Sequence, residues 1–115
     1  MEGSQEVIQE LSKFFEIYIT TAAMEHPSSF HAKFEWLTEH FSFIPQVNYV
    51  FCGDKSIIKA DYLIDDSSRH FRRFQGQGLL FTAPHNVYES GYIRVNNWYE
   101  IREYFNNVKE ASGTF

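Results

Sequence analysis

Two adjacent aspartates, Asp65 and Asp66, directly follow a short apolar run in the sequence. Like charges at the end of a buried strand repel each other, and a bound cation relieves that repulsion. The hydroxyl pair Thr20 and Thr21 and the ammonium of Lys55 also follow apolar runs. Hydroxyls and lysine bind phosphate oxygens, and Mg²⁺ takes one or two carboxylates together with a phosphate. These residue types therefore predict a phosphate-and-magnesium site.

Each of these features also has an ordinary explanation. A threonine pair at a strand end could reflect only β-propensity and a turn, and Lys55 could lie in a solvated turn. The two aspartates could cap a helix. The case for a site rests on all three features occurring directly after apolar runs.

The elements that position these residues follow from the spacing of apolar side chains. Helical spacing predicts helices over residues 4–14, from Pro27 to before Pro45, and after a cap at Asn96 or Asn97. Short apolar runs predict strands at 16–21, 49–52, 61–65 and 79–82. A single helical turn is predicted over 56–59.

Helices that alternate with strands indicate an α/β fold with a parallel, doubly wound sheet. Ligands bind such sheets beyond the carboxyl ends of the strands. Thr20, Lys55 and Asp66 are therefore expected to meet on one edge. His85, which follows the last predicted strand, is a weaker candidate for the same site.

Length and composition narrow the class of protein. The 115 residues predict one domain, 1–115, and the net charge of −5 argues against a nucleic-acid surface. No apolar run approaches the roughly 20 residues of a membrane span, and the acidic amino terminus has no signal-peptide core. Cys52, the single cysteine, fits a reducing compartment. We expect a soluble, cytoplasmic protein without membrane or nucleic-acid partners.

Several segments resemble one known family. The run Gly53–Asp66 closely resembles the third and fourth motifs of the 5′(3′)-deoxyribonucleotidases, which are phosphatases of the haloacid-dehalogenase type. Ile17–Ala22 resembles their second motif, and Phe81–Asn86 resembles the segment after the next strand. The similarity covers roughly residues 3–105 with its spacing preserved.

The resemblance implies a three-layer, Rossmann-like parallel sheet with helices on both faces. It implies that Thr20 hydrogen-bonds the substrate phosphate beside Thr21, and that Lys55 offsets charge in the transition state. Asp66 would coordinate Mg²⁺, with Asp65 orienting it or an adjacent water. The family removes phosphate from deoxynucleoside monophosphates through an aspartyl-phosphate, a covalent route that divides one difficult step into two.

The chain also departs from the family pattern. The family's first motif, Asp-x-Asp on the first strand, has no counterpart in this sequence, and the cap segment that follows it is absent as well. We therefore expect a carboxyl-terminal part of the fold without its first strand and cap, inactive by itself. Strands 16–21 and 62–65 would then pair directly or leave backbone groups unpaired, each at a cost of about 1–3 kcal/mol. A strand recruited from a second copy would make a homo-oligomer.

Two alternatives stay open at this point. A trimmed domain could serve as a non-catalytic module that binds phosphate or a protein partner. A flavodoxin-like or receiver-like domain also combines acidic residues, threonine and lysine at strand ends. In receivers, however, the acidic pair normally precedes the other motifs, whereas here Asp65 and Asp66 follow Thr20 and Lys55.

Overall fold

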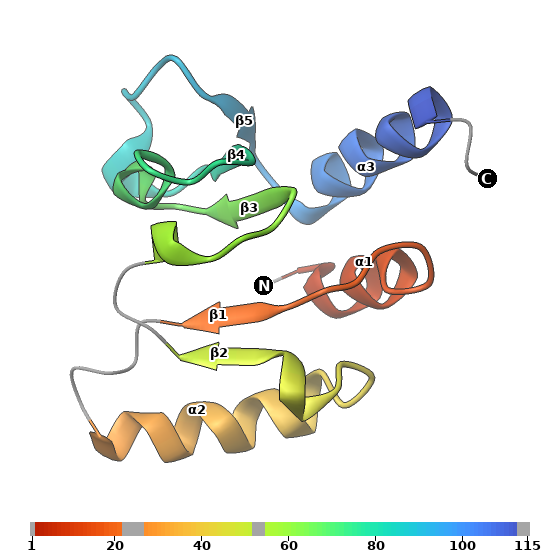
Figure 1. Ribbon diagram of the computed structural model, residues 1–115, viewed down its shortest axis with the longest axis vertical. Coiled ribbons are helices and arrows are strands. Elements are labelled where there is room, and N and C mark those ends of the chain that lie inside the picture. The colour runs from red at the N-terminus through yellow and green to blue at the C-terminus, as the bar shows by residue number, and fades with distance from the viewer. Residues whose placement is uncertain (1, 22–26, 52–54, 113–115) are drawn as a thin grey trace. The chain divides into compact units, whose positions relative to one another are not determined.

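The computed structural model describes residues 2–21, 27–51 and 55–112 (Figure 1). The chain divides into two compact units, residues 3–55 and the part from residue 56 onward. Each unit contains a parallel sheet, and each is described below by itself.

The first unit pairs two short strands between helical segments. Its elements in chain order are α1 (Ser4–Leu11), β1 (Ile19–Thr21), α2 (Pro27–His40), the 3₁₀ turn η2 (Gln46–Asn48) and β2 (Tyr49–Phe51). Strands β1 and β2 run parallel (Figure 1), and the register places Thr20 opposite Val50. A parallel pair needs a crossover connection, and α2 with the turn after it provides one.

An apolar cluster holds the first unit together. Its buried members are Leu37, Phe41 and Ile44, and partly buried residues of α1, β1 and β2 pack against them. The side-chain amide of Asn48 donates a 2.9 Å hydrogen bond to the backbone oxygen of Ile17, which ties the two strands together just before they pair. Because a buried amide costs free energy unless it is bonded, this contact explains a polar residue at that position.

The second unit contains a three-stranded parallel sheet in the order β3-β4-β5. Its elements, from the short turn at the unit boundary onward, are η3 (Lys55–Ile57), β3 (Tyr62–Asp65), η4 (Ser68–Phe71), β4 (Gln77–Phe81), η5 (Pro84–Asn86), β5 (Ile93–Val95) and α3 (Trp98–Ser112). The segments between the strands contain 3₁₀ turns rather than α-helices (Figure 1).

The core of this unit follows from its apolar pattern. Leu79 and Leu80 of β4 are both almost completely buried, although consecutive strand residues point to opposite faces. A strand buried on both faces is typical of a parallel sheet, as the sequence predicted. On α3, Ile101 and Phe105 are buried, and the Phe105 ring lies 5.0 Å from that of Tyr62 in an edge-on contact.

The α/β class and the parallel pairing are confirmed. The strand β5 was not predicted, and α1 ends at Leu11 rather than at residue 14. Within the first unit β1 pairs with β2, and within the second unit β3 pairs with β4. The expected pairing of residues 16–21 with 62–65 stays a prediction. A single domain over 1–115 stays a prediction.

Within residues 2–21, 27–51 and 55–112, none of the helices combines the length and the apolar character that crossing a bilayer requires.

Candidate functional site

The two aspartates lie where the sequence predicted them, at the carboxyl end of β3. Asp65 is the last residue of the strand and pairs with Leu80 of β4. Its side chain is buried, and one carboxylate oxygen accepts a 3.0 Å hydrogen bond from the backbone N–H of Ser67. The Asp66 side chain is exposed, and its carboxylate has no hydrogen-bond partner in the described part of the chain. Asp65 therefore shapes the turn, and Asp66 offers its charge to solvent.

The backbone oxygen of Asp66, unlike its carboxylate, contacts two side chains. Its carbonyl oxygen lies 2.9 Å from Nε2 of His85 and accepts a 3.0 Å hydrogen bond from Nδ2 of Asn86. Both residues belong to η5, the turn that follows β4. His85, the weaker candidate from the sequence, is thus brought next to Asp66, where it contacts the backbone rather than the carboxylate.

Asn86 was not singled out from the sequence, and it is central to this edge of the sheet. Its exposed fraction is 0%. Besides Asp66, its amide nitrogen donates to the backbone oxygen of Phe81 at 2.8 Å. Its amide oxygen accepts from the backbone N–H of Ala83 at 3.0 Å. One buried side chain therefore links the ends of β3 and β4 to the start of η5.

Arg94, in the unpredicted strand β5, completes this network. Its Nη1 donates to the amide oxygen of Asn86 and to the hydroxyl of Thr82, both at 3.0 Å. Its Nη2 donates to the backbone oxygens of Asn86 at 2.9 Å and Glu89 at 2.8 Å. The carboxylate of Glu89 in turn accepts a 2.5 Å hydrogen bond from Ser68 in η4. The planar guanidinium group of arginine can donate several hydrogen bonds at once in a fixed geometry.

The phosphate-binding candidates belong to the first unit. Thr20 and Thr21 are the last two residues of β1, and Thr20 is half-buried. Lys55 opens η3 after the end of β2 and is also half-buried. The two threonines therefore form the carboxyl end of a parallel strand, and Lys55 follows the carboxyl end of another, as predicted. Their roles, and their convergence with Asp66 on one substrate, stay predictions.

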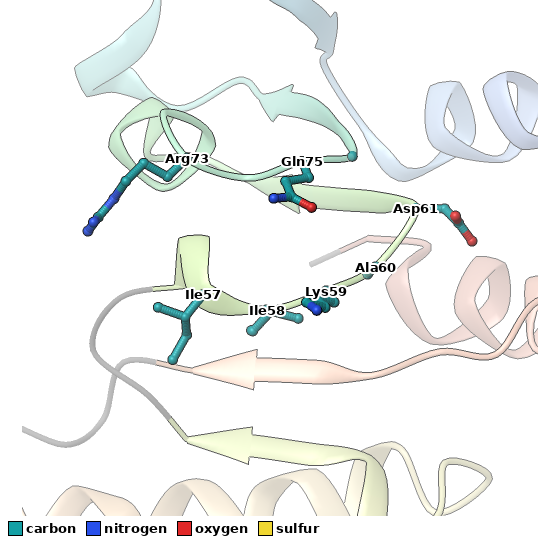
Figure 2. Close-up of a pocket in the computed structure, with 8 residues that line it drawn as sticks. Ile57, Ile58, Lys59, Ala60, Asp61, Arg73 and Gln75 are labelled. Carbon is teal, nitrogen blue, oxygen red and sulfur yellow. The ribbon is translucent and has the colours of Figure 1, made fainter.

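A pocket of about 580 Å³ lies in the second unit, and neither Asp65 nor Asp66 lines it. It is lined by segments that lead into β3 and β4, and includes Lys59, Asp61, Arg73 and Gln75 (Figure 2). In Figure 2 the side chains of Arg73 and Asp61 point away from each other, so their charges do not converge on a ligand. Because parallel sheets bind ligands at the carboxyl ends of their strands, this pocket is the weaker candidate.

The donor set around Asp66 is suited to Mg²⁺. Hard cations prefer oxygen ligands, and Mg²⁺ in phosphate sites takes one or two carboxylates while keeping several waters. The exposed carboxylate of Asp66 can supply one such oxygen ligand. The contacts of the His85 and Asn86 side chains with the backbone oxygen of Asp66 hold its backbone in position. No cluster of three histidine, cysteine, aspartate or glutamate side chains occurs within the described ranges.

Comparison with known proteins identifies the chain's relatives. The profile of the family described as "5′ nucleotidase, deoxy (Pyrimidine), cytosolic type C protein" matches residues 1–110. The 5′(3′)-deoxyribonucleotidases of Bacillus subtilis and of Bacillus phage SPbeta are each 54% identical over 101 residues, which is 88% of this chain and 59% of theirs. A Staphylococcus epidermidis protein, provisionally named 5′(3′)-deoxyribonucleotidase, is 48% identical over 110 residues, 96% of this chain and 62% of its own.

The chain thus spans about three fifths of the length of the curated relatives it matches, 62% and 59% for those just named.

Proposed function

This chain belongs to the family of the cytosolic type C 5′ nucleotidases, and on that premise we propose that it is the phosphate- and metal-binding part of a 5′(3′)-deoxyribonucleotidase. The reaction is hydrolysis of deoxynucleoside monophosphates. The fold is of the haloacid-dehalogenase type, a three-layer parallel sheet. The observation that carries the proposal is the exposed Asp66 carboxylate at the carboxyl end of β3, held through its backbone by two hydrogen-bonding side chains.

In this proposal each candidate residue has a separate role. Thr20 and Thr21 donate hydroxyl hydrogen bonds to the substrate phosphate, and the Lys55 ammonium pairs with its charge. Asp66 holds Mg²⁺, and Asp65 keeps the turn after β3 in place through Ser67. When bound, Mg²⁺ stabilises the negative charge that develops on the phosphoryl oxygens.

The covalent step needs a nucleophile that these 115 residues do not offer. In the family the nucleophile is the first aspartate of Asp-x-Asp, and no such pair occurs in this sequence. Asp54, Asp61, Asp65 and Asp66 are its aspartates, and each already has a place in the family match. We therefore propose that the 115-residue chain binds phosphate and Mg²⁺ but does not turn substrate over alone. A reducing, cytoplasmic location is part of the same proposal.

A second candidate is a non-catalytic module of the same fold, which would bind a phosphate or a protein partner. The sheet topology of the second unit supports this candidate, because β3 and β5 are the outer strands of its sheet and each pairs there with β4. Unpaired strand edges are templates for pairing with another chain. A stable homo-oligomer of the chain, measured by light scattering after size exclusion, would favour this candidate.

A complementation experiment distinguishes the catalytic proposal from the non-catalytic module. The chain is combined with a separate segment that carries the family's Asp-x-Asp strand, and phosphate release from deoxyuridine monophosphate is measured with and without Mg²⁺. We expect Mg²⁺-dependent release that Lys55→Ala abolishes. Lys59→Ala is the matched control, because Lys59 is an exposed lysine close in sequence. A complex that forms but releases no phosphate would contradict the catalytic proposal and favour the binding module.

A further inference from the structure

We propose that Asn86, held by Arg94, is a positioning residue for Asp66 and sets the affinity of the carboxylate for a divalent cation. The inference rests on the proposed function, since it deepens the role of the same site. Asn86 lies in a segment that resembles the family, but neither that resemblance nor the comparisons with relatives give it a role. Its basis is the hydrogen-bond pattern at the carboxyl ends of β3, β4 and β5.

The side chain of Asn86 uses all of its hydrogen-bonding capacity. A primary amide has two N–H donors and an oxygen with two lone pairs. The donors meet the backbone oxygens of Asp66 and Phe81 at 3.0 and 2.8 Å. The oxygen accepts from Ala83 N–H and Arg94 Nη1, both at 3.0 Å. No bonding capacity is left over for a ligand.

This pattern fixes the orientation of the amide. With its oxygen and nitrogen exchanged, the oxygen would face two carbonyl oxygens, while the nitrogen would face the Ala83 N–H and the Arg94 guanidinium. All four contacts would then be repulsive, and unsatisfied buried groups cost about 1–3 kcal/mol each. The donor side of Asn86 therefore points to Asp66 and Phe81.

The orientation of the Asn86 amide affects the position of the Asp66 backbone. Its carbonyl is held by Asn86 and His85, and the neighbouring Asp65 carboxylate accepts from Ser67 N–H. These bonds fix the backbone from which the Asp66 side chain extends. Partners that orient a metal ligand typically change metal affinity about 10–100-fold when they are removed. Asn86, with 0% of its surface exposed, acts through Asp66 and does not itself contact the cation.

The test is a Mg²⁺ titration of the 115-residue chain, monitored through the NMR chemical shifts of the backbone amides of Asp66 and Ser67. Asn86→Asp is the informative variant, because it keeps the size of the side chain and both acceptor contacts but loses both donors. Asn97→Asp is the matched control. It adds the same charge at an exposed residue in the same unit, and aspartate caps a helix as well as asparagine does.

We expect Asn86→Asp to weaken Mg²⁺ binding at least about tenfold, and Asn97→Asp to leave it within about twofold of the parent chain. A folded Asn86→Asp chain that binds Mg²⁺ as tightly as the parent would overturn the inference. If Asn86→Asp does not fold, Arg94→Lys decides the matter. It keeps the charge but loses the fork that holds Asn86, so we expect weaker binding, and unchanged binding would overturn the inference.

The same titration keeps this inference distinct from the proposed function. Absence of Mg²⁺-dependent shifts at Asp66 in the parent chain would contradict the metal site itself, and the positioning role with it. Equal shifts in the parent and Asn86→Asp chains would contradict only the positioning role.

Discussion

The side-chain amide of Asn86 donates a 3.0 Å hydrogen bond to the backbone oxygen of Asp66, 20 residues earlier in the chain. The contact joins the turn after β3 to the turn after β4, two segments that lie at the same edge of a parallel sheet (Figure 1). Asp66 therefore has a backbone held by hydrogen bonds and an exposed carboxylate, the combination that a metal ligand needs.

Asp66→Asn is expected to abolish Mg²⁺ binding without unfolding the chain. The substitution removes the charge of an exposed side chain that has no partner among the described residues, so stability should change by no more than about 0.5 kcal/mol. Mg²⁺ affinity should fall by more than about tenfold, since even the partners of metal ligands contribute that much. Calorimetric titration with Mg²⁺ measures it.

Asp61→Asn is the matched control for that experiment, because Asp61 is also exposed but precedes β3 instead of following it. It should leave Mg²⁺ binding unchanged. Equal losses in both variants would mean that the cation responds to net charge rather than to a site at Asp66.

Much of the fold could be predicted because its strands are apolar and bounded by turns. The strand at 62–65 and its two aspartates were predicted almost to the residue, because the run ends in consecutive charges. Strand β5 was missed because it is short and presents an exposed Ile93, so it lacks a continuous apolar pattern.

The hydrogen-bond network around Asp66 could not be predicted from the sequence for a related reason. Asn86 and Arg94 are polar residues in segments that look like loops, and their contacts depend on the pairing of β4 with β5. Without β5, nothing in the sequence brings Arg94 next to Asn86. The Phe81–Asn86 segment was noted, but only for its resemblance to the family, and of its side chains only His85 was considered for the site.

Asn97→Ala should destabilise the second unit by about 1 kcal/mol. The side-chain oxygen of Asn97 accepts a 2.9 Å hydrogen bond from the backbone N–H of Glu100, the N-cap contact of α3. Of the two capping candidates in the sequence, Asn97 accepts from a backbone N–H of the first turn, whereas Asn96 donates to the carboxylate of Glu100. Urea unfolding followed by circular dichroism measures the loss.

Asn107→Ala is the control for the cap, because Asn107 is an exposed residue within the same helix. Alanine has the higher helix propensity, so this variant should be as stable as the parent or slightly more stable. If Asn97→Ala were as stable as Asn107→Ala, the capping role would be wrong.

Gly76→Ala should destabilise the chain by about 1–3 kcal/mol, the range for an overpacked site. A β-carbon at this position would lie 2.5 Å from the backbone oxygens of both Ala60 and Asp61, and backbone cannot move aside as a flexible side chain can. Gln75→Ala, at the exposed neighbouring residue, should have little effect. Thermal unfolding of the two variants side by side tests this, and equal melting temperatures would argue against the close approach.

The central claim is that this chain holds the phosphate- and metal-binding part of a deoxyribonucleotidase and lacks its nucleophile. The most direct measurement is phosphate release from deoxyuridine monophosphate by the purified 115-residue chain with Mg²⁺ present, with the Bacillus subtilis relative as the positive control. We predict no release above the protein-free rate, because no Asp-x-Asp is available to form the aspartyl-phosphate. Steady, Mg²⁺-dependent release by the chain alone would contradict the account.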